Sequence, residues 1–168
     1  MNKQFVKLKF LNHKQLHQSK RSEASHSDEY ATPKPTFKSL CLEYGIKPKL
    51  DVCATKNNRK CAKYFNKIQN GLKKPWKVDF FCNPPNSLTQ KFIRKACYEW
   101  GINNVNGIMI IPANSTVTKA GKLFLWNKRN PRMYPLLPTP RFFYNGKETP
   151  ETARNRYVTV VFRERKKK

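Results

Sequence analysis

The order of predicted elements along the 168-residue chain favours a single three-layer α/β domain, with helices on both faces of a mostly parallel sheet. Two observations support this fold class. Apolar runs at residues 50–54, 78–82 and 107–111 have the length and composition of buried strands, and helix-like segments alternate with them. The β-branched run at residues 157–162 predicts a last strand, so we expect the sheet to end in an antiparallel hairpin.

Apolar residues at helical spacing predict two well-defined helices. The first is expected to begin at Thr32, whose hydroxyl can cap it, to carry Pro33 in its first turn and to end at Gly45. The second covers residues 87–100, with apolar residues on one side and basic residues on the other, and Gly101 is expected to end it. These helices would cover the predicted sheet.

The remaining segments are less regular. Aromatic and aliphatic residues at 123–126 indicate a third helix, and residues 133–137 and 141–144 resemble strands inside a region rich in proline and arginine. Residues 55–77 are polar and basic. We therefore expect the insertions at 55–77 and 127–150 to lie on the surface, where they could contact a partner.

The dominant compositional property is a formal net charge of +25, with a pI near 10.2. Such a field attracts polyanions, and double-stranded DNA is the predicted partner. A membrane surface is the rival, but the sequence contains no apolar run near 18 residues. The N-terminus lacks the apolar stretch of a secretory signal, so we predict an intracellular, cytoplasmic location. A monomer is expected.

The charge pattern also suggests how the chain is divided. Residues 1–27 are predicted to form a flexible basic arm that contacts phosphates, residues 28–163 the folded domain, and residues 164–168 a basic tail.

Several chemistries are disfavoured by what the sequence lacks. The five cysteines form no C-x-x-C pair, so reduced thiols and no metal site are expected. Phosphate-binding and dinucleotide-binding glycine motifs are absent, and all three histidines lie in the first 26 residues. Acidic residues number only ten, and they do not cluster.

One motif stands out against this background. The apolar strand ending at Cys82 runs directly into Asn83, Pro84, Pro85 and Asn86. Two prolines hold the backbone extended and leave no N–H group to donate, so the Asn83 side chain and the nearby carbonyls are expected to face outward. This end of a parallel strand is where open α/β sheets bind ligands.

Five segments together resemble the phage-type DNA N6-adenine methyltransferases, a Dam-like family. They are Tyr30-Ala31-Thr32-Pro33, Leu50-Asp51-Val52-Cys53-Ala54, Asn70-Gly71-Leu72, Phe81-Cys82-Asn83-Pro84-Pro85 and Ile111-Pro112-Ala113. The resemblance covers about residues 28–162, and it implies a Rossmann-like methyltransferase fold, S-adenosylmethionine as cofactor and a flipped target adenine.

By this resemblance, Asn83, Pro84, Pro85 and Asn86 form the catalytic motif. The Asn83 oxygen and a proline carbonyl would accept hydrogen bonds from the adenine N6 amino group. The resemblance assigns five further residues to the cofactor: Tyr30, Thr32, Pro33, Asp51 and Asn70. The Asp51 carboxylate would hold the cofactor's ammonium group.

The chain departs from the family pattern at two positions. Asn86 replaces an aromatic residue that stacks on the flipped base, and Tyr98, Phe81 or Tyr144 could take its place. Asn70 replaces an aspartate.

The candidate DNA-binding residues are basic and lie on the polar side of the second helix or in the insertion at 127–150. They are Lys91, Arg94, Arg129, Arg132 and Arg141. Two alternatives remain open: a non-catalytic DNA-binding protein on a methyltransferase scaffold, and methylation of another exocyclic amine, in cytosine (N4) or RNA.

Overall fold

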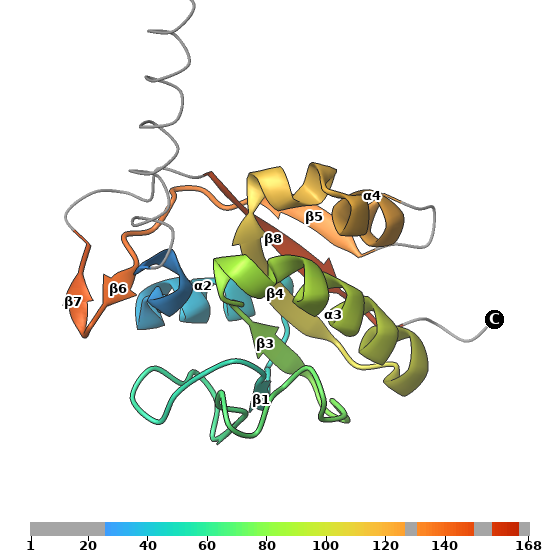
Figure 1. Ribbon diagram of the computed structural model, residues 1–168, viewed down its shortest axis with the longest axis horizontal. Coiled ribbons are helices and arrows are strands. Elements are labelled where there is room, and N and C mark those ends of the chain that lie inside the picture. The colour runs from blue at the N-terminus through green and yellow to red at the C-terminus, as the bar shows by residue number, and fades with distance from the viewer. Residues whose placement is uncertain (1–25, 127–130, 150–155, 165–168) are drawn as a thin grey trace, which may run out of the picture.

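The computed structural model describes residues 26–126, 131–149 and 156–164. Its centre is a six-stranded sheet with helices on both faces (Figure 1). The predicted N-terminal arm lies almost entirely outside the described residues, as do Arg129 and the C-terminal tail.

Five of the six strands run in the same direction, and only β8 runs in the opposite one. The strand order is β2 (Lys63–Tyr64), β1 (Leu50–Asp51), β3 (Phe80–Cys82), β4 (Gly107–Pro112), β8 (Tyr157–Phe162) and β5 (Arg132–Pro135). β8 is antiparallel to both β4 and β5. The predicted last strand therefore has an antiparallel partner, but it is inserted between two strands instead of forming a terminal hairpin.

Three helices cover the sheet, and they confirm the mixed α/β class. α3 (Thr89–Asn103) and α4 (Lys119–Leu125) pack with one apolar cluster, whereas α2 (Lys34–Tyr44) packs with a second cluster on the opposite face. Alternate side chains of β4 belong to the two clusters. Ile108 and Ile110 belong to the α2 side, and Met109 and Ile111 to the α3 side. All four side chains are fully buried, as expected for a strand covered on both faces.

The N-terminal end of α2 differs from the prediction. Thr32 does not cap the helix; the N-cap position is Pro33, and no side chain there bonds the helix amides. Proline has the φ that a helix entry requires, so the chain starts α2 without a hydroxyl cap. The other end is as predicted, because Gly45 adopts a left-handed conformation with φ 56°.

The C-terminal end of α3 also corrects the prediction. The helix continues through Gly101 and ends at Asn103, where Asn104 takes the left-handed conformation with φ 52°. Glycine weakens a helix by only about 1 kcal/mol. Tertiary bonds beyond it outweigh that cost, including one from Asn103 Nδ2 to the Trp76 carbonyl at 3.1 Å.

Short elements complete the fold. The strands β6 (Phe143–Tyr144) and β7 (Lys147–Glu148) form a separate hairpin. The described ranges also contain three 3-10 helices: η1 (His26–Glu29), η2 (Asn86–Leu88) and η3 (Ala113–Val117). η3 follows β4 directly and η2 follows β3 after residues 83–85, so both strands end in a turn at the same edge of the sheet.

All five cysteines lie in the described part of the chain, and none of them forms a disulfide there. The thiols of Cys53 and Cys82 share a hydrogen bond, with their sulfur atoms 3.8 Å apart. Within the described ranges, no helix has the length and apolarity needed to cross a bilayer. No cluster of three potential metal-ligating side chains occurs there either.

Candidate active site

The predicted catalytic motif leaves the sheet at the carboxyl end of β3. Asn83 is half-buried, and its amide Nδ2 donates to the carbonyl of Tyr30 at 3.1 Å. In the described part of the chain, no hydrogen bond reaches the Asn83 Oδ1. The side chain is thus anchored through its nitrogen, while its oxygen keeps its acceptor capacity.

Tyr30 belongs to a segment that lies between the motif and the small hairpin. Ala31 and Phe143 exchange two backbone hydrogen bonds of 2.8 and 2.9 Å. The Tyr30 ring stacks on Phe142 with a centroid distance of 6.2 Å, and it meets Tyr144 edge-on at the same distance. Segments from residues 30–31 and 142–144, far apart in sequence, therefore meet beside Asn83.

A second contact holds the same N-terminal segment against the motif. The Asp28 carboxylate accepts a hydrogen bond from the backbone N–H of Ser87 at 2.9 Å and another from its hydroxyl. Ser87 follows the motif in η2. Together with the Tyr30 carbonyl, Asp28 ties residues 28–30 to both ends of the motif.

The three aromatic residues that could replace the ring absent at position 86 lie in different parts of the fold. Phe81 is buried under α2 and Tyr98 is 58% exposed on α3. Only Tyr144 lies beside Tyr30, which is bonded to Asn83. An aromatic surface is thus present near Asn83, although it comes from a different element than the motif.

Asn86, the residue at the fourth motif position, is half-buried and points toward β8. Burial raises the pKa of Tyr157, and a hydrogen bond from the Asn86 side chain opposes that rise. Tyr157 is the first residue of β8 and packs on the Phe142 ring at 4.8 Å. The amide of Asn86 therefore meets the edge of the aromatic cluster.

Asp51 lies at the carboxyl end of β1, in the strand that was predicted from the sequence. The side chain is 3% exposed, and its Oδ2 accepts a hydrogen bond from the Lys60 backbone N–H at 2.9 Å. Burial raises the pKa of Asp51 to about 6, while backbone bonds from Lys60 and Cys53 partly offset the rise. A carboxylate in this position is stabilised by any cation that approaches it.

Thr32 lies in the first predicted cofactor segment and is 3% exposed. Its hydroxyl is buried with no hydrogen-bond partner among the described residues. Such a group costs about 1–3 kcal/mol unless something bonds it. The arrangement fits a site in which a ligand supplies the missing partner. Pro33, next in the chain, is buried at the start of α2.

Asn70 forms a tight turn against the end of β1. Its φ is 55°, and its Oδ1 accepts a hydrogen bond from the Leu72 N–H at 3.2 Å. The following Gly71 approaches β1 so closely that a Cβ there would lie 2.1 Å from the Val52 carbonyl oxygen. The turn therefore uses the Asn70 oxygen, and only its amide NH₂ is left for a ligand.

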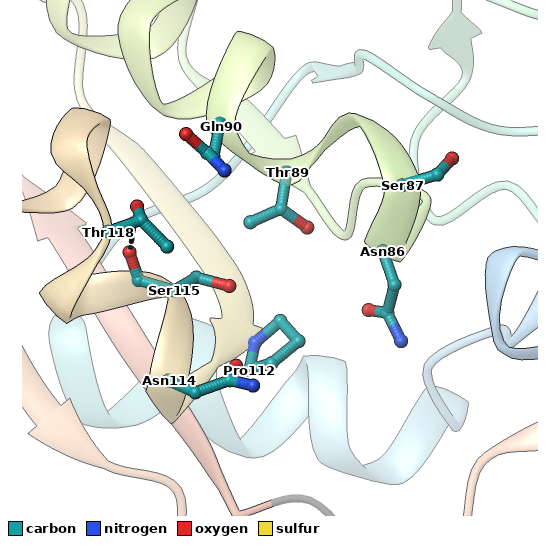
Figure 2. A pocket seen from close by; sticks show the side chains of 8 residues that line it. All are labelled: Asn86, Ser87, Thr89, Gln90, Pro112, Asn114, Ser115 and Thr118. Atoms are coloured by element: carbon teal, nitrogen blue, oxygen red, sulfur yellow. Dashed lines mark hydrogen bonds between the residues drawn. The ribbon is translucent and has the colours of Figure 1, made fainter. Parts of the chain in front are cut away.

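A polar pocket of about 230 Å³ lies between the ends of β3 and β4 (Figure 2). Its eight lining residues are all uncharged, and they include Asn86 and Ser87 from the motif side. Asn114, Ser115 and Thr118 line it from the β4 side. The sequence analysis did not predict these pocket-lining residues after β4. The only signal was the abrupt stop at Pro112, which repeats the stop after β3.

The candidate DNA-binding residues do not line this pocket. Four of them are exposed: Lys91, Arg94, Arg132 and Arg141. The Arg94 guanidinium lies 5.8 Å from the Phe124 ring, and Arg141 is 4.0 Å from the Glu148 carboxylate. Arg129 lies outside the described residues. Nothing in these contacts prevents the four cations from meeting phosphates.

Comparison with known proteins adds an independent observation. A family model described as "DNA N-6-adenine-methyltransferase (Dam)" matches residues 18–121 of the chain. A curated protein, the DNA N-6-adenine-methyltransferase of Escherichia phage T1, is 32% identical over 91 residues. That similarity covers 53% of this chain and 38% of the phage protein, so the chain spans well under half of that relative. The matched region includes the motif after β3 and the end of β4.

Proposed function

Because the chain belongs to the DNA N-6-adenine-methyltransferase (Dam) family, we propose that it transfers a methyl group from S-adenosylmethionine to the N6 amino group of adenine in DNA. The observation that carries the proposal is the orientation of Asn83. Its Nδ2 is fixed on the Tyr30 carbonyl at 3.1 Å, so its Oδ1 is directed as a preorganised acceptor.

In this proposal, Asn83 Oδ1 and the Pro84 carbonyl accept the two N6–H groups of an adenine that has been flipped out of the duplex. These bonds hold the amino nitrogen with its lone pair toward the methyl donor, which lowers the entropic part of the barrier. An amide serves as well as a carboxylate here, because the role is acceptance and positioning. Flipping the base costs about a few kcal/mol.

The cofactor is assigned to the ends of β1 and the segment before α2. S-adenosylmethionine would supply an electrophilic methyl group on a sulfonium. The buried Asp51 carboxylate suits the cofactor's ammonium, and the unpartnered Thr32 hydroxyl suits a polar group beside it. Tyr30, Pro33 and the Asn70 NH₂ complete the assignment. The mixed six-stranded sheet is compatible with the Rossmann-like methyltransferase fold that this role requires.

The aromatic surface near Asn83 favours an enzyme over a non-catalytic scaffold. Asn86 carries no ring, but Tyr30 and Tyr144 lie together beside the bond that orients Asn83. Base stacking on an aromatic ring contributes about 1–3 kcal/mol. We assign this contribution to Tyr144, with Tyr30 holding it in place.

The test is methyl transfer by the Asn83→Ala variant. We expect the rate to fall by at least about 100-fold, the typical loss when one preorganised polar group is removed. DNA affinity should change little, and Asn57→Ala, an exposed asparagine, serves as the matched control.

The measurement is single-turnover transfer of a labelled methyl group, followed by nucleoside digestion and mass spectrometry. Digestion distinguishes N6-methyladenine from N4-methylcytosine, and an RNA substrate tests the remaining alternative. Equal rates for Asn83→Ala and the wild type would refute the assignment of Asn83. Absence of S-adenosylmethionine binding to the folded protein would instead support the non-catalytic scaffold.

A further inference from the structure

Two thiols lie against each other beside the proposed site. The sulfur atoms of Cys53 and Cys82 are 3.8 Å apart and share a hydrogen bond. Cys82 is the last residue of β3, and Cys53 follows shortly after the end of β1, the parallel neighbour of β3 (Figure 1). The contact between the two thiols therefore links the carboxyl ends of adjacent strands.

The packing around the pair keeps the two sulfur atoms close. Cys82 has no exposed surface and belongs to the apolar cluster beneath α3, and Cys53 is half-buried and packs against the same cluster. The Cys61 and Cys97 thiols instead donate to backbone carbonyls. For Cys53 and Cys82 to form a disulfide, the sulfur separation has to fall from 3.8 Å to about 2.05 Å.

The two thiols differ in how they can react. Burial raises the pKa of Cys82 well above its ordinary value, and the Cys53 thiol and the Asp51 carboxylate act in the same direction. Cys82 is also closed to an external oxidant, because none of its surface is exposed, whereas Cys53 keeps partial exposure. Oxidation has therefore to begin at Cys53, and Cys82 is placed to resolve the oxidised sulfur.

We propose that Cys53 and Cys82 form an oxidation site, at which a hydroperoxide converts the thiol pair into a reversible disulfide. With hydrogen peroxide, the Cys53 thiolate attacks one oxygen and the O–O bond breaks. Hydroxide leaves, takes up the proton lost by the thiol and becomes water, and Cys53 becomes a sulfenic acid.

The second step closes the bond between the strands. The Cys82 sulfur attacks the Cys53 sulfur, so the S–S bond forms and the S–O bond breaks. The hydroxyl group leaves as water with the Cys82 proton. In sum, the two thiols lose two electrons, and one hydrogen peroxide is reduced to two molecules of water.

The disulfide would act on the proposed site through the backbone at both of its ends. Cys82 directly precedes Asn83, whose Nδ2 donates to the Tyr30 carbonyl at 3.1 Å. On the other strand, the Cys53 N–H donates to the Asp51 carboxylate. A displacement of about 1 Å in an active site can cost about 100-fold in rate. This consequence rests on the proposed function, whereas formation of the disulfide does not.

The test treats the full chain with hydrogen peroxide, blocks the remaining thiols with N-ethylmaleimide and identifies the cysteine peptides by mass spectrometry. We expect a linked pair of peptides that contain Cys53 and Cys82 and separate on treatment with dithiothreitol. Formation of the disulfide should also shift the NMR resonances of the Asn83 side-chain amide. Methyl transfer should fall by about 10- to 100-fold and recover with dithiothreitol.

Matched variants assign the effect to this pair. Cys53→Ser should give no linked peptide, and peroxide should leave its methyl-transfer rate unchanged relative to its own untreated rate. Cys97→Ser, at a half-buried cysteine on α3, is the control and should lose activity as the wild type does. Cys53→Ala replaces the serine variant if that variant is unstable.

Three outcomes would overturn the proposal: no linked peptide from peroxide-treated folded protein, equal oxidant sensitivity of Cys53→Ser and the wild type, or Asn83 resonances that stay unchanged when the disulfide forms. Failure of the proposed function is a different result. A protein that forms the disulfide and shifts the Asn83 resonances, but transfers no methyl group, retains the oxidation site and loses the proposed function.

Discussion

Asp51 is the side chain whose acid–base chemistry the tertiary structure changes most. In solution an aspartate is ionised at neutral pH by a wide margin, but burial at the end of β1 raises the pKa of Asp51 to about 6. Two backbone amides bond the carboxylate, and one of them is Lys60 N–H at 2.9 Å. A bound ammonium group would favour the ionised form and so bring the pKa down again.

We therefore predict that S-adenosylmethionine binds more tightly as pH rises from 5 to 7. Below a pKa of about 6 the acid is protonated, so binding must release a proton, and affinity should approach a tenfold change per pH unit. Above that pKa the dependence should flatten. Calorimetry across this range is the measurement. Asp51→Asn should bind weakly at all pH values, and a wild type without pH dependence would contradict the assignment.

The same shift has a consequence for stability. Because the folded-state pKa lies above the ordinary value, the folded protein holds this proton more tightly than the unfolded chain. The contribution of Asp51 to the free energy of unfolding is thus full below pH 4 and lost as pH rises through about 6. Asp51→Asn removes this dependence.

At the scale of elements, two glycines illustrate opposite roles. Gly101 lies inside α3, exposed, with no atom within 4 Å of a Cβ placed there. Gly71 lies in the turn that presses on β1, where the same Cβ would collide with the Val52 carbonyl at 2.1 Å. Gly101 lowers the stability of its helix, whereas at Gly71 the close packing leaves no room for a side chain.

We predict opposite changes in the free energy of unfolding for these two positions. Gly101→Ala should stabilise the protein by up to about 1 kcal/mol, the difference in helix propensity. Gly71→Ala should destabilise it by about 1–3 kcal/mol or more, because backbone must move to admit the Cβ. Urea denaturation measures both. A destabilising Gly101→Ala would show that α3 ends at the glycine after all.

At the scale of the whole molecule, charge and site are separated. The net charge is +25, but the pocket lining contains no charged residue. The exposed candidates, such as Arg94 on α3 and Arg132 on β5, do not line this pocket. This division matches a common arrangement in nucleic-acid recognition, in which phosphate contacts position the polymer and neutral contacts read bases.

We predict that deletion of residues 1–25 weakens DNA binding and reduces its salt dependence. The segment carries six basic side chains and one acidic one, so the slope of log affinity against log salt should fall by up to about 5. The deletion leaves Asp28 and its bonds to Ser87 in place. Fluorescence anisotropy at several salt concentrations is the measurement, and an unchanged slope would exclude the arm from the DNA contact.

Local pattern determined much of this protein. Strands that are buried on both faces must be apolar throughout, so 107–111 and 157–162 were recognisable as β4 and β8. Two prolines after Cys82 necessarily end a strand, and this predicted the motif's place at the sheet edge. The left-handed end of α2 at Gly45 follows from the same local chemistry.

Tertiary structure decided what depends on residues distant in sequence. Nothing local places Tyr30 against Phe142, or joins Asn86, Ser115 and Gln90 around one pocket, because these contacts arise only when the strands align. Local capping rules failed at Thr32 and Gly101, since packing energy exceeded the small local preference. The chemistry at the motif was thus encoded in a few adjacent residues, whereas its surroundings required the folded chain.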